Sequence, residues 1–291
     1  MKMAENIDTW INRFAAGING LRVDAGVYPE RLQAAIDVGW HTGNPLPGSA
    51  GLGHVGAMKL ISDGSLNTRS AYCSTPYSGI EPPTYGTLSY TPQQIEDYMR
   101  LATEHGFDIA CHAIGDEANT IALNAVAATH AHGSIEHAQM LKPVDIPRFA
   151  ELGLTASIQP QHAMDDRDVI TRFWANPAGI PYPFRALHDA GTTLRMGSDA
   201  PVAPLDPWLA ISAAVLGTES SDREPFQPEQ CLDVHTSLAA STATGRDRLA
   251  SGDPADVVLL DADPYAADTP EAMRAMPQHV VMTLLCGERT Y

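Results

Sequence analysis

The sequence predicts an α/β fold in which parallel strands alternate with helices. Two observations lead to this prediction: short apolar runs recur along the chain, and segments with helix start and stop signals separate them. A third observation concerns the ends of these runs, several of which carry a lysine, a histidine or an aspartate. In a barrel of this type the strands end at one common mouth, so we expect these polar residues to meet there.

Six apolar runs are predicted as strands. A closed barrel of alternating strands and helices has eight, so the predicted set is two strands short of closure. The predicted strands are residues 20–28, 56–64, 107–114, 133–138, 153–159 and 193–198.

Helical periodicity and capping residues define the segments between the strands. The clearest helix covers 91–106, where Thr91 is a cap, Pro92 takes the first position and Gly106 is a stop. The other predicted helical segments are 5–17, 29–40, 116–131, 143–152, 181–190, 205–216 and 227–243.

Two long segments and the tail depart from this alternation. Residues 65–90 lack a regular pattern, which is typical of a functional loop over a site, and residues 163–180 are expected to help shape the same pocket. The tail holds two short strands with no crossover helix of barrel type between them. We therefore predict a barrel portion over residues 1–250 and a small antiparallel β layer over residues 251–291.

Composition narrows the class of partner. The chain has 291 residues and a formal net charge of -17, which disfavours nucleic acid and anionic membranes as partners. Its four cysteines are scattered without a CxxC pair, as in a reduced, cytoplasmic protein, and no apolar run approaches the length of a membrane span. A small-molecule partner fits these properties.

Four residues at strand ends form the candidate site. Four different apolar runs end in Lys59, His112, His137 and Asp199, and two histidines on consecutive strands favour metal ligation over structural roles. Asp199 also has a simpler interpretation as a helix cap. A buried lysine is costly unless it is neutral or paired, so Lys59 is predicted to carry a carbamate that binds metal. An ion pair with Asp63 and a substrate-binding ammonium are the alternatives.

Two further residues are candidates for substrate contact. His162 lies just past the end of strand 153–159, on the same predicted mouth. Arg69 lies in the long loop and could bind a substrate carboxylate or anchor the loop. The remaining histidines show no pattern that separates them from surface or packing residues.

The motifs KLISDGSLNTRSA, ACHAIGDEA, SIEHAQ, ASIQPQH and GSDAPV resemble the amidohydrolase superfamily, and within it the family 3 or YtcJ-like metal-dependent hydrolases. The resemblance implies a TIM-type barrel represented by its strands three to eight, followed by C-terminal strands of a small β-sandwich. It implies that carboxylated Lys59, His112, His137 and Asp199 bind metal and that Asp199 also carries the proton. It further implies that His162 faces the substrate and is a catalytic residue that helps the metal polarise the carbonyl. The HxH motif of the family's first strand is missing from this sequence, which predicts an N-terminally truncated chain.

The resemblance implies hydrolysis of a non-peptide carbon–nitrogen bond, of the amide or N-formyl type, by metal-activated water. One or two divalent ions, with zinc expected, would be the cofactor. Two alternatives stay open: a truncated fragment without turnover, and an esterase or phosphoesterase on the same fold. The unpaired strand edges of the predicted barrel also favour a homo-oligomer or a complementing N-terminal half.

Overall fold

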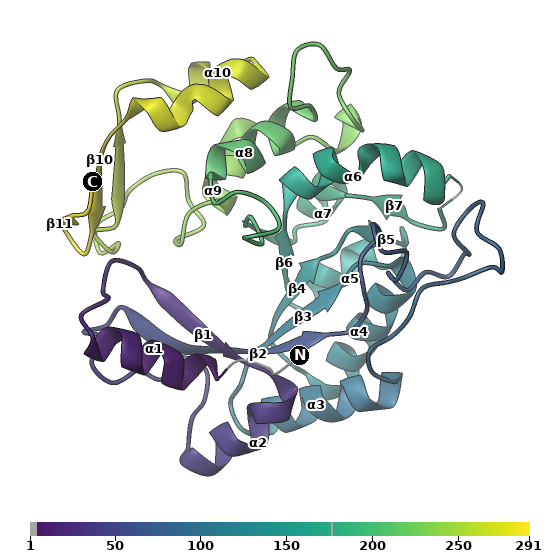
Figure 1. Ribbon diagram of the computed structural model, residues 1–291, viewed down its shortest axis with the longest axis horizontal. Coiled ribbons are helices and arrows are strands. Elements are labelled where there is room, and N and C mark those ends of the chain that lie inside the picture. The colour runs from purple at the N-terminus through teal and green to yellow at the C-terminus, as the bar shows by residue number, and fades with distance from the viewer. Residues whose placement is uncertain (1–4, 176) are drawn as a thin grey trace.

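The computed structural model describes residues 5–175 and 177–291. Residues 1–4 of the predicted barrel portion and residue 176 of the predicted pocket segment lie outside the described residues. Six strands form one sheet in the order β1-β2-β3-β4-β6-β8, and each neighbouring pair is parallel (Figure 1). The strands are β1 (Val23–Val27), β2 (Gly53–Ile61), β3 (Ile109–Ala113), β4 (Gly133–His137), β6 (Thr155–Ile158) and β8 (Thr193–Met196). All six predicted strands are confirmed, together with the α/β class.

Helices connect successive strands, as parallel pairing requires. The predicted cap of α3 is confirmed, because the Thr91 side chain accepts from the Gln94 N–H and the Gln94 side chain accepts from the Thr91 N–H. The helices are α1 (Asn6–Ala15), α2 (Pro29–Val38), α3 (Pro92–Glu104), α4 (Asp116–Thr129), α5 (Ile146–Glu151), α6 (Pro160–Phe173), α7 (Phe184–Asp189), α8 (Pro207–Leu216), α9 (Val234–Ala240) and α10 (Pro270–Ala275).

The structure differs from the predicted elements most clearly in two helical segments. Helix α6 occupies much of the segment predicted as an irregular pocket wall. Its buried face holds Ala163, Asp166, Ile170 and Phe173 at helical spacing, and the carboxylate of Asp166 on this face hides the apolar pattern. The predicted helix over 227–243 is shorter: a 3-10 turn at Pro228–Gln230 is followed by extended backbone, and the Asp233 side chain then caps α9.

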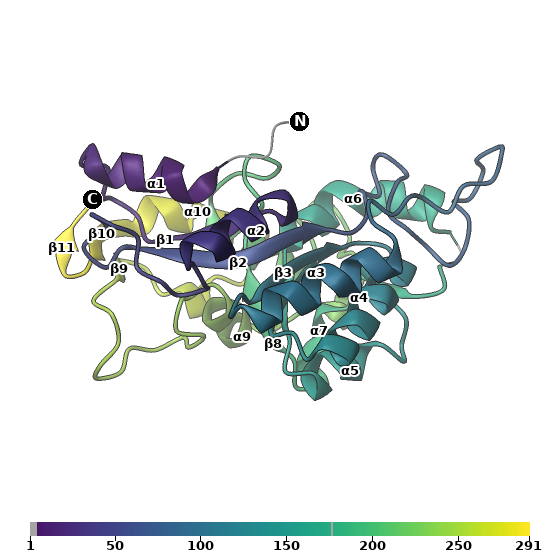
Figure 2. The same ribbon diagram turned by 90° about the horizontal axis from the view of Figure 1, so that it is seen from below.

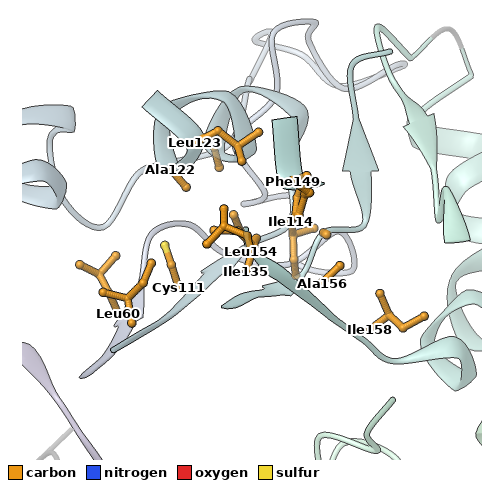
Figure 3. Packing of buried hydrophobic residues seen from close by; sticks show 14 of the residues in the cluster. Leu60, Cys111, Ile114, Ala122, Leu123, Ile135, Phe149, Leu154, Ala156 and Ile158 are labelled. Carbon is orange, nitrogen blue, oxygen red and sulfur yellow. The ribbon is translucent and has the colours of Figure 1, made fainter. Parts of the chain in front are cut away.

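The core packs between the sheet and the helices on its outer face. Leu60, Cys111, Ile135 and Ala156 are paired across four neighbouring strands and are fully buried (Figure 3). Because side chains alternate along a strand, Lys59, one residue before Leu60, lies on the opposite face of the sheet. The alternation therefore places this row of side chains against the helices, including Leu123 of α4, and directs Lys59 away from them.

The tail forms a separate three-stranded antiparallel sheet, which confirms the predicted antiparallel layer. It lies beside α1 and β1 (Figures 1 and 2), where Arg22 forms an ion pair with Asp256. A separate two-stranded sheet pairs β5 with β7, and the Met140 N–H of β5 donates to the carbonyl of Ile114 just past β3. These smaller strands are β5 (Met140–Leu141), β7 (Ile180–Pro181), β9 (Val257–Leu260), β10 (Val280–Leu285) and β11 (Glu288–Arg289). Among the described residues, no helix combines the length and apolar character needed to span a membrane.

Candidate metal centre

The predicted site residues come from the C-terminal ends of neighbouring strands. His112 lies near the end of β3 and His137 is the last residue of β4. His162 lies in the first turn of α6, directly after β6, and Asp199 follows β8. Because β3, β4, β6 and β8 are parallel neighbours, their ends lie along one edge of the sheet, and the side chains that follow them converge there.

His137, His162 and Asp199 form the tightest group at this edge. One potential ligand atom from each of them lies within 4.8 Å of the other two. The two imidazoles are stacked, with ring centroids 5.9 Å apart and an interplanar angle of 14°. Both histidines are buried, whereas Asp199 is exposed. The structure thus adds His162, predicted as a catalytic residue and substrate contact but not as a metal ligand, to the residues that can reach one ion.

Two nitrogen atoms in this group lack the partner that a buried polar atom normally has. Nδ1 of His137 and Nε2 of His162 are buried and make no hydrogen bond with any residue of the ranges 5–175 and 177–291. Unpaired imidazole nitrogens beside a carboxylate are the donor set that zinc and other divalent transition metals bind. The group therefore fits a divalent metal ion.

His137 is also electrostatically suited to this role. Burial is the main cause that lowers its pKa well below the ordinary value of 6.5, and the neighbouring His112 and Lys59 lower it further. A lowered pKa keeps the imidazole neutral at physiological pH, the form in which histidine binds a metal. Because this imidazole is already neutral, a metal ion that binds His137 does not have to displace a proton from the ring.

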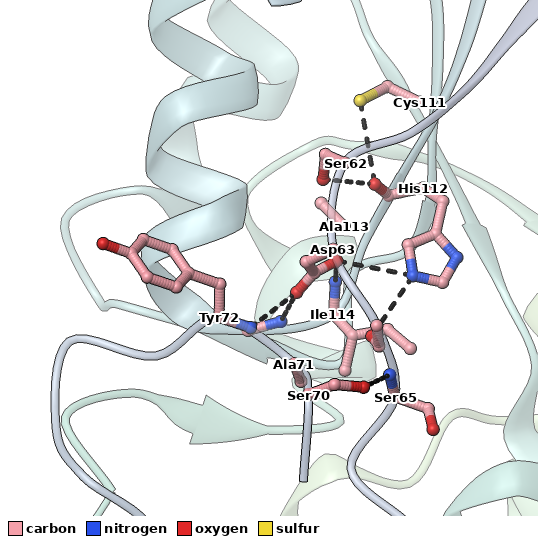
Figure 4. Close-up of polar contacts among 12 residues, drawn as sticks. Ser62, Asp63, Ser65, Ser70, Ala71, Tyr72, Cys111, His112, Ala113 and Ile114 are labelled. Atoms are coloured by element: carbon pink, nitrogen blue, oxygen red, sulfur yellow. Dashed lines mark hydrogen bonds and ion pairs between the residues drawn. The ribbon is translucent and has the colours of Figure 1, made fainter. Parts of the chain in front are cut away.

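His112 extends the group on the side of β3. Its ring lies edge-on to His137, with centroids 4.5 Å apart. Its Nε2 is 3.3 Å from the carbonyl oxygen of Gly64 and 3.4 Å from Oδ1 of Asp63 (Figure 4). Three of the four residues predicted as metal ligands, together with His162, are thus brought to one edge of the sheet.

Lys59 lies further back along β2. It is half-buried and faces the small residue Gly26 of β1, whose Cβ, if present, would lie 3.9 Å from that of Lys59. Within residues 5–175 and 177–291 its ammonium group has no ion pair or hydrogen bond. The alternative of an ion pair with Asp63 is not observed, because the Asp63 carboxylate is directed to backbone N–H groups and to His112.

The long loop 65–90 is anchored to the core rather than loose. Ser74 donates to the buried Asp116 carboxylate, and Tyr77 packs against Phe173 and Trp174 of the α6 end. Arg69 is exposed and its guanidinium carbon lies 5.5 Å above the Phe173 ring. This contact supports the loop-anchoring interpretation of Arg69, and its predicted contact with substrate stays a prediction.

Backbone strain is concentrated at the same edge. His137, Ala138 and Asp199 have φ values of 75°, 45° and 55°, in the left-handed region that non-glycine residues rarely occupy. Strain of this kind costs roughly 1–3 kcal/mol per residue and is typical of functional sites. It turns the chain sharply at the ends of β4 and β8, where the candidate ligands lie.

Two polar residues of the site were not predicted as site residues. The sequence predicts Asp63 only as an alternative ion-pair partner of Lys59, although a carboxylate at the end of a buried strand is a usable signal. Gln159 has a buried side-chain oxygen without a partner and lies close enough to His137 to influence its pKa. Its position after β6 gave no comparable signal in the sequence.

Comparison with known proteins agrees with this geometry. A model of the amidohydrolase family matches residues 12–291. YtcJ of Bacillus subtilis, whose name assigns it to the amidohydrolases, is 31% identical over 229 residues, which are 73% of this chain and 43% of that protein. The N-substituted formamide deformylase of Arthrobacter pascens is 25% identical over 240 residues, 74% of this chain and 42% of that protein.

A solved structure supports the same relationship. The crystal structure of an uncharacterised metal-dependent hydrolase from Pyrococcus horikoshii matches with a TM-score of 0.73 and 27% identity, over 82% of this chain and 48% of that chain. The chain therefore spans about half the length of the relatives it matches. From the family match over 12–291 and the convergent histidines and aspartate, we conclude that this chain belongs to the amidohydrolase family of metal-dependent hydrolases.

Proposed function

We propose that this chain forms part of a hydrolase that cleaves a non-peptide carbon–nitrogen bond, of the amide or N-formyl type. The observation that carries the proposal is the group of His137, His162 and Asp199, with two buried imidazole nitrogens that lack a partner. The similarity to a formamide deformylase supports the substrate class. His112 completes the group, and zinc is the ion that its nitrogen and carboxylate donors suit best.

A divalent ion bound here supplies Lewis acidity and lowers the pKa of a water molecule towards about 7. The remaining chemistry belongs to the side chains. The exposed carboxylate of Asp199 is accessible to solvent and substrate, so it can accept the proton of the attacking water and pass it to the leaving nitrogen. The two buried imidazoles hold their positions because the stacked rings pack against each other.

We further propose that Lys59 carries a carbamate when metal is present. Its half-buried position and the lack of an observed anionic partner support this modification, because a carbamate replaces an unpaired ammonium with an oxygen ligand. Lys59→Ala is expected to lower metal content, and added bicarbonate should raise the metal content of the natural chain but not of the variant. Equal metal binding by both proteins, with no response to bicarbonate, would exclude the carbamate.

His162 has two assignable roles, and one variant separates them. The geometry favours ligation, so we expect His162→Asn to weaken zinc binding by about tenfold or more. Unchanged zinc affinity with a reduced kcat/KM would instead leave His162 as the substrate contact predicted from the sequence. Arg69→Ala tests the second predicted contact in the same assay, where a raised KM for carboxylated substrates alone would identify it as a substrate residue.

The function itself is tested in two steps. Zinc binding by the purified chain is measured first, and then release of free amine from a panel of N-formyl and N-acyl amines. Asp199→Asn should abolish turnover, whereas Asp206→Asn, which alters the cap of α8, is the matched control. A chain that binds zinc but hydrolyses nothing in the panel fits the non-catalytic alternative. Hydrolysis of esters or phosphoesters without amides would replace the proposed substrate class.

A further inference from the structure

The side chain of Asp63, two residues after the end of β2, is a buried carboxylate beside the candidate site. It is 1% exposed and accepts three backbone hydrogen bonds. Its Oδ2 accepts from the N–H groups of Tyr72 and Gly115, both at 2.9 Å, and its Oδ1 accepts from Ile114 at 3.1 Å (Figure 4). These bonds hold the carboxylate in one orientation, with Oδ1 also directed towards His112.

The surroundings leave this carboxylate no room to move. The loop that carries Tyr72 passes so close to Gly115 that a Cβ there would lie 2.0 Å from the Tyr72 carbonyl oxygen. The two N–H donors to Oδ2 are therefore brought together by direct backbone packing. Because Oδ2 is held on one side, Oδ1 is fixed at 3.4 Å from Nε2 of His112.

Both groups that face Nε2 of His112 are acceptors. One is Oδ1 of Asp63, and the other is the Gly64 carbonyl oxygen at 3.3 Å. In a neutral imidazole one nitrogen carries the proton and the other carries a lone pair, and the hydrogen bond at one nitrogen decides which. The Gly64 carbonyl can only accept a hydrogen bond from Nε2, and the Asp63 carboxylate lies at ion-pair distance from the same atom. Together they favour the tautomer with the proton on Nε2, which leaves the lone pair on Nδ1.

We propose that Asp63 is a positioning residue that fixes the orientation and tautomer of His112, so that Nδ1 is its metal-binding atom. The proposal rests on the metal-binding role of His112 in the proposed function. Partners of this kind orient metal-binding histidines, and their loss typically costs about 10- to 100-fold in metal affinity. Asp63 also binds the N–H of Tyr72, so the same carboxylate places loop 65–90 and orients a ligand.

Asp63→Asn is the informative variant. The asparagine keeps the size of the side chain, and its oxygen can retain the two N–H donors at the Oδ2 position. Its NH2 group would then replace Oδ1, lose the hydrogen bond from the Ile114 N–H and turn a donor towards Nε2 of His112. In this variant the NH2 group disfavours a proton on Nε2 of His112, whereas the Gly64 carbonyl still favours it. We therefore expect a mixture of the two tautomers.

Asp116→Asn is the matched control. Asp116 is also fully buried, and it also accepts hydrogen bonds from the long loop, through the backbone N–H and the hydroxyl of Ser74. In the described part of the chain it makes no hydrogen bond or ion pair with a histidine. A purely structural effect of removing a buried loop-anchoring carboxylate should therefore appear in both variants.

Two measurements test the proposal. Nitrogen-15 NMR of histidine-labelled, metal-free protein at about pH 8, where an ordinary imidazole is neutral, reports the tautomer, with the His112 signals assigned from His112→Gln. We expect a protonated Nε2 in the natural chain and in Asp116→Asn, and a loss of that state in Asp63→Asn. Zinc affinity, measured by competition with a chelating dye, should fall about 10- to 100-fold in Asp63→Asn alone.

The outcomes separate the two proposals. A proton on Nδ1 of His112 in the natural chain would overturn the positioning role whatever the zinc measurement gives. Equal losses of zinc affinity in Asp63→Asn and Asp116→Asn, with unchanged tautomers, would overturn it as well. If the natural chain binds no zinc, the proposed hydrolase function fails, and the tautomer measurement still decides whether Asp63 positions His112.

Discussion

Because the imidazole of His137 is buried, we predict that the unfolding free energy of the metal-free protein depends on pH. Burial holds its pKa in the folded protein well below 6.5, whereas in the unfolded chain it returns to the ordinary value. Below about pH 6.5 the unfolded chain therefore binds a proton that the folded protein does not. The part of the unfolding free energy that depends on His137 is therefore fully present above that pH and decreases as the pH falls. This is the direction expected for a histidine whose pKa is lowered in the folded protein.

The size of the effect follows from one proton. Linkage gives about 1.4 kcal/mol of unfolding free energy for each pH unit over which the unfolded state holds one extra proton. Integrated from about pH 7.5 to about pH 5.5, the metal-free protein should lose about 1.4 kcal/mol through this residue. His137→Asn removes the titrating group and should abolish that part of the pH dependence.

Urea unfolding at the two pH values, in the presence of a chelator, measures the difference. The other titrating groups contribute equally to both proteins, so the comparison between His137→Asn and the natural chain isolates one residue. His132→Asn, which changes an exposed histidine in the turn before β4, is the control and should behave like the natural chain. An unchanged pH dependence in His137→Asn, or an NMR titration of His137 at or above pH 6.5, would refute the reasoning.

Three further predictions concern other parts of the fold. Gly133→Ala should destabilise the protein by about 1–3 kcal/mol in urea unfolding, because Gly133 has a φ of 136° and an added Cβ would lie 2.0 Å from the Ile109 carbonyl oxygen. An unchanged unfolding midpoint would contradict this packing. Tyr182→Phe removes the hydroxyl that donates to buried Asp166 at 2.7 Å and should cost about 1–3 kcal/mol in the same assay, whereas no loss would mean that the bond does not form. Burial raises the pKa of Cys73 and of Cys111 to about 12. Mass spectrometry after iodoacetamide treatment near pH 8 should therefore find exposed Cys286 modified first. Early modification of either buried thiol would disagree with their burial.

Much of the fold was predictable because the signals for it are local. The six strands of the parallel sheet follow from apolar runs, and α3 follows from the capping pattern that begins at Thr91. Helix α6 escaped prediction because its charged residues interrupt the apolar spacing, and its buried face is recognised only where it packs on neighbouring elements. The segment 227–243 was instead predicted to be more helical than it is. Its composition favours a helix, but a 3-10 turn forms at Pro228 and the cap at Asp233 starts α9 only at Val234.

The candidate site divides in the same way. The sequence alone determined which donors this chain offers, because strand-like runs end in His112, His137 and Asp199 and parallel strands end at one edge. Only the tertiary structure decided which of them meet: it brought His162 into the group, directed Asp63 to His112 and left Lys59 without an observed partner. The order of residues along the chain determines which donor types occur and at which strand ends they lie. Distances of a few ångströms between these donors depend on sheet curvature, left-handed turns and loop packing, which arise from contacts between distant segments.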